Sequence, residues 1–189
     1  MFDYPLLDKI TDIRMFACRT GNIAAGLAAN SEILQCRWPI TNTSGKMVLL
    51  GLKVNCGAAG TAFTPGAVSL RLGRCLPFTA DGSGGTAQSL AATKTYSNGA
   101  GTDVPTLRVA STAALGAGTK TIGEDFGNLV SAVDAAQNQF VPDSFMFKAD
   151  DWKIPMIFAG DEGFIVRANV PATGVWMAGF QMAWGTLPA

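Results

Sequence analysis

Residues 163–184 read GFIVRANVPATGVWMAGFQMAW, and they contain the two clearest runs of strand periodicity in the chain. Successive side chains of a strand point to opposite faces, so apolar residues at every second position predict a strand with one buried face. Phe164, Val166, Ala168 and Val170 share a face of the first run, and PATG forms a turn after it. One face of the second run carries Trp176, Ala178, Phe180, Met182 and Trp184, and the other carries Val175, Met177, Gly179, Gln181 and Ala183. Two largely apolar faces indicate a central strand that is buried on both sides or is covered by a neighbouring subunit.

The same periodicity continues through 33–40 (ILQCRWPI), 47–55 (MVLLGLKVN) and 67–75 (AVSLRLGRC). The turn sequence TNTSG separates the first two runs, which predicts that they form a hairpin. Many short strands between Gly- and Pro-containing turns are typical of an all-β fold. We therefore predict an antiparallel β-sandwich or jelly-roll-like domain with an extended N-terminal arm and at most one or two short helices.

The domain organisation follows from where this strand pattern begins. We expect an N-terminal arm, or a short helix plus a loop, over 1–30, because Leu6, Ile10 and Ile13 have helical spacing and 20–30 (TGNIAAGLAAN) has the composition of a loop. A single β-rich domain over 31–189 would follow, with a long Gly-, Ala- and Ser-rich loop at about 79–106. The apolar residues of 124–137 (EDFGNLVSAVDAAQ) recur at i, i+3, i+4 and i+7, which predicts a helix there.

The composition excludes several classes of function. The chain has no histidine, which removes Ser-His-Asp and Cys-His nucleophiles and the commonest metal ligand and general base. Its 14 Lys and Arg balance its 14 Asp and Glu, so the chain lacks the excess of basic residues that nucleic-acid-binding proteins use to neutralise phosphates. We therefore expect no nucleic-acid partner. We expect no enzyme activity, no catalytic residue, no cofactor and no metal. No secretory signal or membrane-spanning run is evident, so we expect synthesis in the cytosol and no membrane partner.

Cys18, Cys36, Cys56 and Cys75 have no C-x-x-C spacing. In a cytosolic chain of this length, isolated cysteines are typically small buried apolar residues, not disulfides or zinc ligands. We expect the same of all four.

The glycine-rich stretch TADGSGGTAQ (79–88) lacks the lysine that follows the glycines of a phosphate-binding P-loop, so we interpret it as a structural turn. The acidic doublets Glu124-Asp125, Asp150-Asp151 and Asp161-Glu162 are not ready-made acid–base pairs, because adjacent residues of a strand point to opposite faces. We expect these doublets in solvated turns.

The aromatic residues allow an alternative function. Exposed tryptophans could stack on sugar rings, as in a carbohydrate-binding module, but the alternating apolar strands around most of these residues favour the core or an interface. The residues concerned are Trp38, Trp152, Trp176 and Trp184, with Phe164 and Phe180.

Three segments resemble small virion structural proteins of tailed bacteriophages: FTADGSGGTA (78–87), VASTAALGAGTKT (109–121) and DEGFIVRANVPATGVWMAGFQMAW (161–184). The resemblance extends over 22–184 and rests on the order and composition of these segments. It implies a β-rich, non-enzymatic capsid decoration or cement protein on the outer surface of the head, which bridges neighbouring capsomers. A tail or baseplate component is the alternative within the same class.

The partners expected from this resemblance are the major capsid protein and further copies of the chain, as a trimer or dimer, after synthesis in the host cytoplasm. The resemblance brings no defined site. Exposed apolar segments would form the contacts, and the candidate interface residues are Phe2, Tyr4, Leu6, Leu7, Trp152, Trp176 and Trp184.

Overall fold

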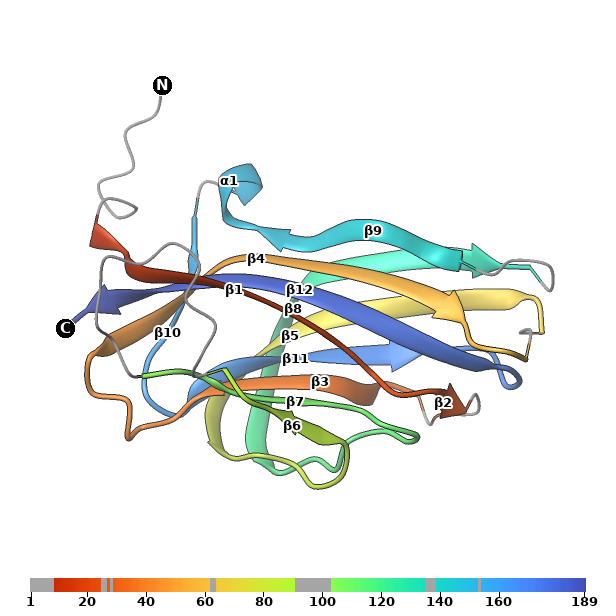
Figure 1. Ribbon diagram of the computed structural model, residues 1–189, viewed down its shortest axis with the longest axis horizontal. Helices are drawn as coiled ribbons and strands as arrows, with labels where there is room; N and C mark the ends of the chain where they lie inside the picture. The colour runs from red at the N-terminus through yellow and green to blue at the C-terminus, as the bar shows by residue number, and fades with distance from the viewer. Residues whose placement is uncertain are drawn as a thin grey trace.

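The computed structural model describes residues 9–24, 27, 29–61, 64–90, 103–134, 139–152 and 154–189. Within these ranges the chain forms two antiparallel sheets and one short helix, α1 (Ala149–Trp152) (Figure 1). Sheet A contains β1 (Thr11–Arg19), β2 (Ile23–Ala24), β4 (Gly45–Ala58), β9 (Gln139–Lys148), β10 (Met156–Phe158) and β12 (Val175–Pro188). Sheet B contains β3 (Ser31–Trp38), β5 (Gly66–Ala80), β6 (Thr86–Gln88), β7 (Thr106–Val109), β8 (Thr119–Val133) and β11 (Glu162–Asn169). The predicted all-β class is confirmed.

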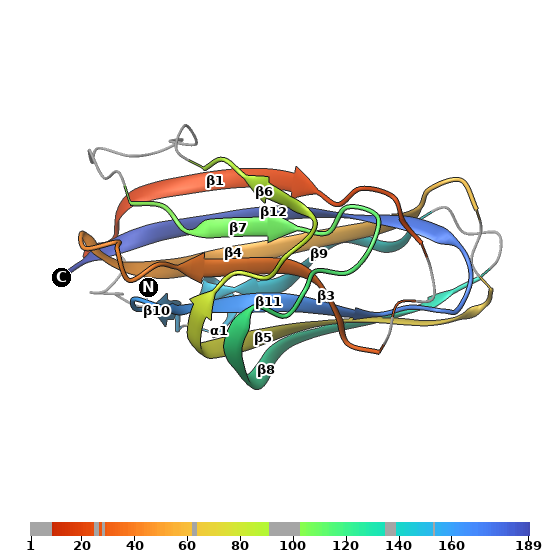
Figure 2. The same cartoon turned by 90° about the horizontal axis from the view of Figure 1, so that it is seen from below.

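The long strands pair in a nested order. β1 pairs with β12, β3 with β11, β4 with β9 and β5 with β8, and every pair is antiparallel. The β1–β12 and β4–β9 pairs belong to sheet A, and the β3–β11 and β5–β8 pairs belong to sheet B. The chain therefore crosses between the two layers from each pair to the next (Figure 2). This is the strand order of a jelly roll, one of the two architectures that the sequence predicted.

The hydrophobic core lies between the two sheets. The face of β12 that carries the tryptophans points inward, and all five of its residues are buried as the alternation predicted. Sheet B contributes the matching layer, including Phe164 and Val166 of β11 and Cys36 and Trp38 of β3. Removing these side chains from water contributes about 25 cal/mol for each Å² of apolar surface, which is the main driving force for closing the sandwich.

The predicted hairpin of 33–40 with 47–55 is wrong. β3 belongs to sheet B, between β7 and β11, whereas β4 belongs to sheet A, between β12 and β10. The turn between them therefore connects the two layers and does not join paired neighbours. Periodicity identifies which face of a strand is buried but not which strand it pairs with, so the pattern was equally compatible with both arrangements.

The helix predicted over 124–137 is also wrong for the part that the structure describes, because 119–133 forms β8. Val130, which the helical pattern assigned to the buried face, is 67% exposed, while Phe126 and Leu129 pack against the core. Gly127 permits this strand to pass close to β9, since a Cβ there would lie 2.4 Å from the Met146 carbonyl oxygen. Long-range pairing with β5 has overridden a weak local preference.

Within 1–30, the interpretation as an arm or short helix is wrong for Thr11–Arg19. This segment is strand β1, which pairs with β12 from Thr11↔Thr186 to Arg19↔Gly179. Its pattern was obscured because Arg14 and Asp12 are both buried and form an ion pair with each other. Residues 1–8, 25, 26 and 28 lie outside the described residues.

The four cysteines are free, as expected. Cys36, Cys56 and Cys75 are buried and Cys18 is half-buried. Burial raises the pKa of Cys18, Cys56 and Cys75 to about 12, and it raises that of Cys36 well above its ordinary value. The thiols are therefore protonated near neutral pH and are poor nucleophiles.

Candidate interaction surfaces

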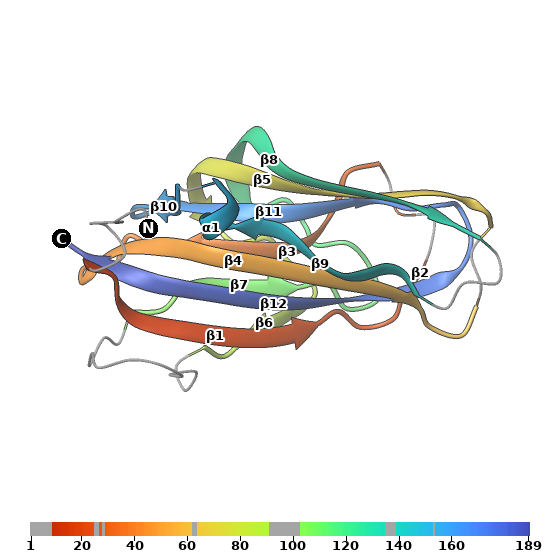
Figure 3. The ribbon, with the colours of Figure 1, turned by 90° about the horizontal axis from the view of Figure 1, so that it is seen from above.

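The outer face of sheet A has a hollow in its middle. β1, β12, β4 and β9 lie side by side in this face (Figure 3). Ala183 of β12 pairs with Met15 on one side and with Gly51 on the other, and Gly51 pairs in turn with Lys148. Because Ala183 and Gly51 have little or no side chain, they form the floor of a groove of about 390 Å³ between the longer residues of β1 and β9. We call this hollow the sheet A groove.

The walls of the sheet A groove are apolar and its rim is charged. Met15 and Phe145 remain 48% and 44% exposed. Lys53 and Lys148 approach the Phe145 ring, with Nζ 4.8 and 5.8 Å from its centroid. Lys53 also pairs with Asp143 at 3.1 Å. Exposed ion pairs of this kind contribute about 0–1 kcal/mol, so burial of the apolar walls offers more binding energy than contacts with the charged rim.

Lys148 has two acidic partners on the rim. Its Nζ lies 3.3 Å from a carboxylate oxygen of Asp151 and 3.7 Å from one of Asp150. The rim therefore carries both signs of charge. Charge alone does not select an occupant for the groove.

A second apolar surface lies where β8 and β9 approach one another at the side of the sandwich. Phe126, Phe147, Ile154 and Met156 line a cleft of about 230 Å³, which we call the lateral cleft. The two phenylalanine rings meet edge to face with centroids 5.8 Å apart. Ile154 is 71% exposed at the mouth, so burying it against a partner would remove apolar surface from water.

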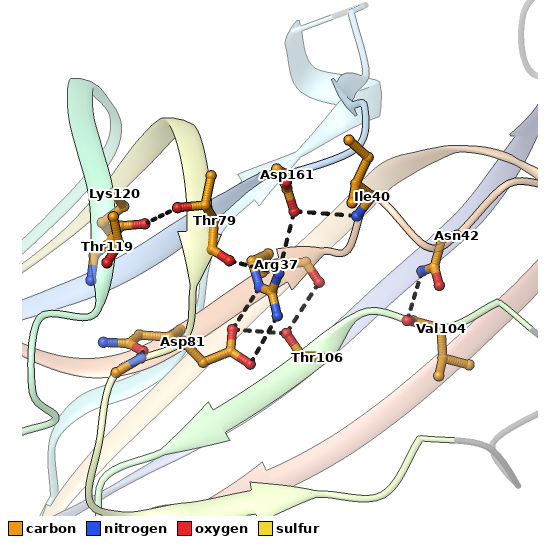
Figure 4. A network of polar contacts seen from close by, with 12 residues as sticks. Arg37, Ile40, Asn42, Thr79, Asp81, Val104, Thr106, Thr119, Lys120 and Asp161 are labelled. Atoms are coloured by element: carbon orange, nitrogen blue, oxygen red, sulfur yellow. Dashed lines mark hydrogen bonds and ion pairs between the residues drawn. The ribbon is translucent and has the colours of Figure 1, made fainter.

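The glycine-rich stretch 79–88 is anchored to β3 by Arg37 (Figure 4). The Arg37 guanidinium donates to Asp81 at 2.9 Å, to Asp161 at 3.3 Å and to the Thr79 carbonyl at 3.2 Å, and the Thr106 hydroxyl donates to Asp81 at 3.0 Å. The hydrogen bond with Asp81 is the main cause of the raised pKa of Arg37. Asp81 is therefore engaged by internal partners, as expected for a structural turn.

Gly82 lies next to Asp81 and is packed against another loop. Its N–H donates to the Gln35 side-chain oxygen at 2.8 Å, and the Gln35 amide donates to the Gly116 carbonyl at 2.8 Å. A Cβ on Gly82 would lie 1.8 Å from the Gly116 carbonyl oxygen, so only glycine permits this approach.

We expect Gly82→Ala to lower the free energy of unfolding by about 1–3 kcal/mol. The new methyl must push the two loops apart, and the buried Gln35 side chain would then lose its hydrogen bonds to Gly82 and Gly116. Urea denaturation followed by circular dichroism measures the change. Gly51→Ala is the control, since its Cβ would meet nothing closer than 3.6 Å. Equal stability of the two variants would contradict the tight packing inferred at Gly82.

The structure corrects two of the candidate interface residues. Trp176 and Trp184 are fully buried inside the sandwich, so they are not available to a partner or a sugar. Trp38, Phe164 and Phe180 belong to the same core, so most of the aromatic residues considered for stacking on sugar rings are buried. The candidates Phe2, Tyr4, Leu6 and Leu7, and the side chain of Trp152, lie outside the described residues.

The acidic doublets are mostly engaged in ion pairs. Asp150 and Asp151 are exposed, as expected, and pair with Lys148. Asp125 and Glu162 instead lie on strands and pair with arginines of sheet B, which the prediction of solvated turns missed. In the described parts of the chain, no group of three His, Cys, Asp or Glu is placed to hold a metal ion, and no helix is long and apolar enough to cross a membrane.

Sequence reasoning also missed the sheet A groove. The apolar outer residues of 175–184 were the one available signal, and they did indicate a strand face that a partner could cover. Gly51 and Phe145 gave no signal, because their place beside Ala183 depends on strand pairing across the whole chain.

Comparison with known proteins gives only weak similarities. No family model matches the chain, and no curated protein matches it. The 60-mer capsid protein of BFDV shares 7% identity over 94% of this chain and 96% of that one, with a TM-score of 0.28. The VP2 subviral particle protein of infectious bursal disease virus shares 10% identity over 95% of this chain and 43% of its own length, with a TM-score of 0.16. Scores this low support no conclusion about function.

Proposed function

We propose that this protein is a non-enzymatic structural component of a virus particle that acts through contacts with neighbouring subunits. The observation that carries the proposal is the nested pairing of the long strands, because jelly rolls of this kind form viral capsid domains as well as lectin domains. Both roles occur on this architecture, because one fold hosts more than one function. The resemblance of three segments to virion proteins of tailed bacteriophages supports the first of these two roles.

The finer proposal is a capsid decoration or cement protein on the outer surface of the head, which bridges capsomers and binds the major capsid protein and other copies of itself. The low content of charged residues and zero net charge favour association over strong mutual repulsion. The lateral cleft offers apolar surface at the edge of the sandwich for such a contact. Specific interfaces bury about 1,600 Å², and a lattice multiplies each weak contact through avidity.

The tryptophans do not support the alternative of a carbohydrate-binding module, since Trp38, Trp176 and Trp184 are core residues. The tail or baseplate alternative differs from the decoration role in copy number. Quantitative mass spectrometry of purified particles therefore tests the proposal. A ratio to the major shell protein near one, or a simple fraction of it, would support decoration. A low copy number would indicate the tail, and absence from particles would refute a virion role.

We expect Ile154→Asn to reduce occupancy of particles about tenfold, because replacing an apolar contact by an amide costs roughly 1.4 kcal/mol or more at a buried interface. Occupancy is measured by adding purified variant to particles that lack the protein. Ile40→Asn is the matched control, since Ile40 is 68% exposed and does not line the lateral cleft. Equal loss in both variants, or no loss in Ile154→Asn, would show that the lateral cleft is not the contact.

A further inference from the structure

The chain before β1 lies on the outer face of sheet A. Ile10 immediately precedes β1 and is only 8% exposed. It packs closely against Gly185 of β12, where a Cβ would lie 2.2 Å from the Ile10 Cγ2 atom. Gly185 and the groove-floor residue Ala183 are two positions apart on one strand, a distance of about 7 Å. Ile10 therefore lies over β12 next to the sheet A groove.

Residues 1–8, which continue the chain beyond this point, have the composition of a segment that packs against protein. They read MFDYPLLD, and five of the eight are large apolar or aromatic residues: Met1, Phe2, Tyr4, Leu6 and Leu7. Eight extended residues span about 27 Å. The groove wall at Met15 lies four residues into β1, about 13 Å from Thr11. The segment is therefore long enough to turn back at Ile10 and cover the groove.

We propose that residues 1–8 bind in the sheet A groove of their own chain. Large side chains of the segment fill the hollow above Ala183 and Gly51 and cover Met15 and Phe145, the two most exposed apolar walls. Proline at position 5 suits an extended segment, because it fixes the backbone and restricts the residue before it. The mixed charges of the rim accommodate Asp3 and Asp8 without selecting for them, so apolar contact drives the binding.

Binding of residues 1–8 in the sheet A groove is measured on purified protein, and it does not depend on a virion role. Particle occupancy and groove occupancy are measured in separate experiments, so either proposal can fail alone.

Photo-crosslinking of the full-length chain tests the proposal. Tyr4 is replaced by p-benzoylphenylalanine, the protein is irradiated, and adducts are located by mass spectrometry. We expect a monomer-mass adduct whose crosslinks fall on groove residues, above all Met15 and the Phe145–Lys148 stretch. The same photo-reactive residue at Ile40 is the control for position, and we expect it to label none of them, since it lies in the turn between β3 and β4.

A variant of the floor tests whether the groove itself holds the segment. Ala183→Leu fills the hollow, and we expect it to reduce the Tyr4 crosslinks about fivefold or more, as a lost apolar contact should. Ala17→Leu is the matched control, because Ala17 is exposed on the same outer face but does not line the groove. Urea denaturation followed by circular dichroism checks that both variants fold, and we expect them to have equal midpoints.

Groove crosslinks that disappear in Ala183→Leu and persist in Ala17→Leu support the proposal. Groove crosslinks found only in a dimer-mass adduct would overturn binding within one chain and assign the groove to the segment of a second copy. Crosslinks scattered over the surface, or unchanged in Ala183→Leu, would overturn the groove as the binding site.

Discussion

Replacing Trp38 by alanine is expected to lower the free energy of unfolding by about 3–5 kcal/mol, which is the usual cost of truncating a buried tryptophan. Trp38 is fully buried at the end of β3, and its indole N–H donates to the Gly45 carbonyl at 3.0 Å. The variant would leave a cavity between the sheets. It would also remove the hydrogen bond from the Trp38 indole of β3, in sheet B, to the Gly45 carbonyl at the start of β4, in sheet A. Both losses act on the contact between the two layers.

Urea denaturation monitored by circular dichroism measures this loss. Ile40→Ala removes a large apolar side chain that is 68% exposed, and we expect its effect to stay within about 0.5 kcal/mol. A loss of under 1 kcal/mol in Trp38→Ala would mean that the core collapses around the missing ring, and the tight packing inferred between the sheets would be wrong.

Lys120→Met is expected to lower the free energy of unfolding by about 3–5 kcal/mol, because it leaves the buried Glu32 carboxylate without its cation. The Lys120 Nζ lies 2.8 Å from a Glu32 oxygen, and the two side chains are only 2% and 10% exposed. The same Nζ lies 5.0 Å from the centre of the Phe78 ring. Phe78 belongs to the small cluster with Cys75 and Ile165, so the pair also closes over apolar surface.

Two further variants separate charge from packing. Lys53→Met removes an exposed partner of Asp143 and should cost at most about 1 kcal/mol. The double variant Lys120→Met with Glu32→Gln removes both charges and should recover much of the stability, since breaking a buried pair costs more than replacing it. If the double variant were less stable than Lys120→Met alone, the uncompensated charge would not be the cause of the loss.

The strands with clear alternation, and their buried faces, were predictable from the sequence. The residues Trp176, Ala178, Phe180, Met182 and Trp184 alternate along the chain, and the structure buries all of them. Alternation has this power because it reports a local geometric property, the side on which each residue projects. The absence of histidine was equally evident, because the sequence alone shows it.

The errors in the prediction have a common origin. The hairpin of 33–40 with 47–55 was expected because the runs are neighbours in sequence, but β3 and β4 belong to different layers. The helix over 124–137 was expected from a short pattern that pairing with β5 overrode. β1 was missed because two charged residues, Asp12 and Arg14, are buried as a pair. In each case a partner distant in sequence decided the local structure.

The sequence by itself determined that this protein is β-rich, because the alternation in 33–40, 47–55, 67–75 and 163–184 depends only on neighbouring residues. The tertiary structure alone decided the jelly-roll order and both apolar surfaces. Met15, Gly51, Phe145 and Ala183 meet in one groove through the register of β1, β4, β9 and β12. Register is set by the packing of the whole sandwich, since each strand settles where its apolar face meets the opposite sheet.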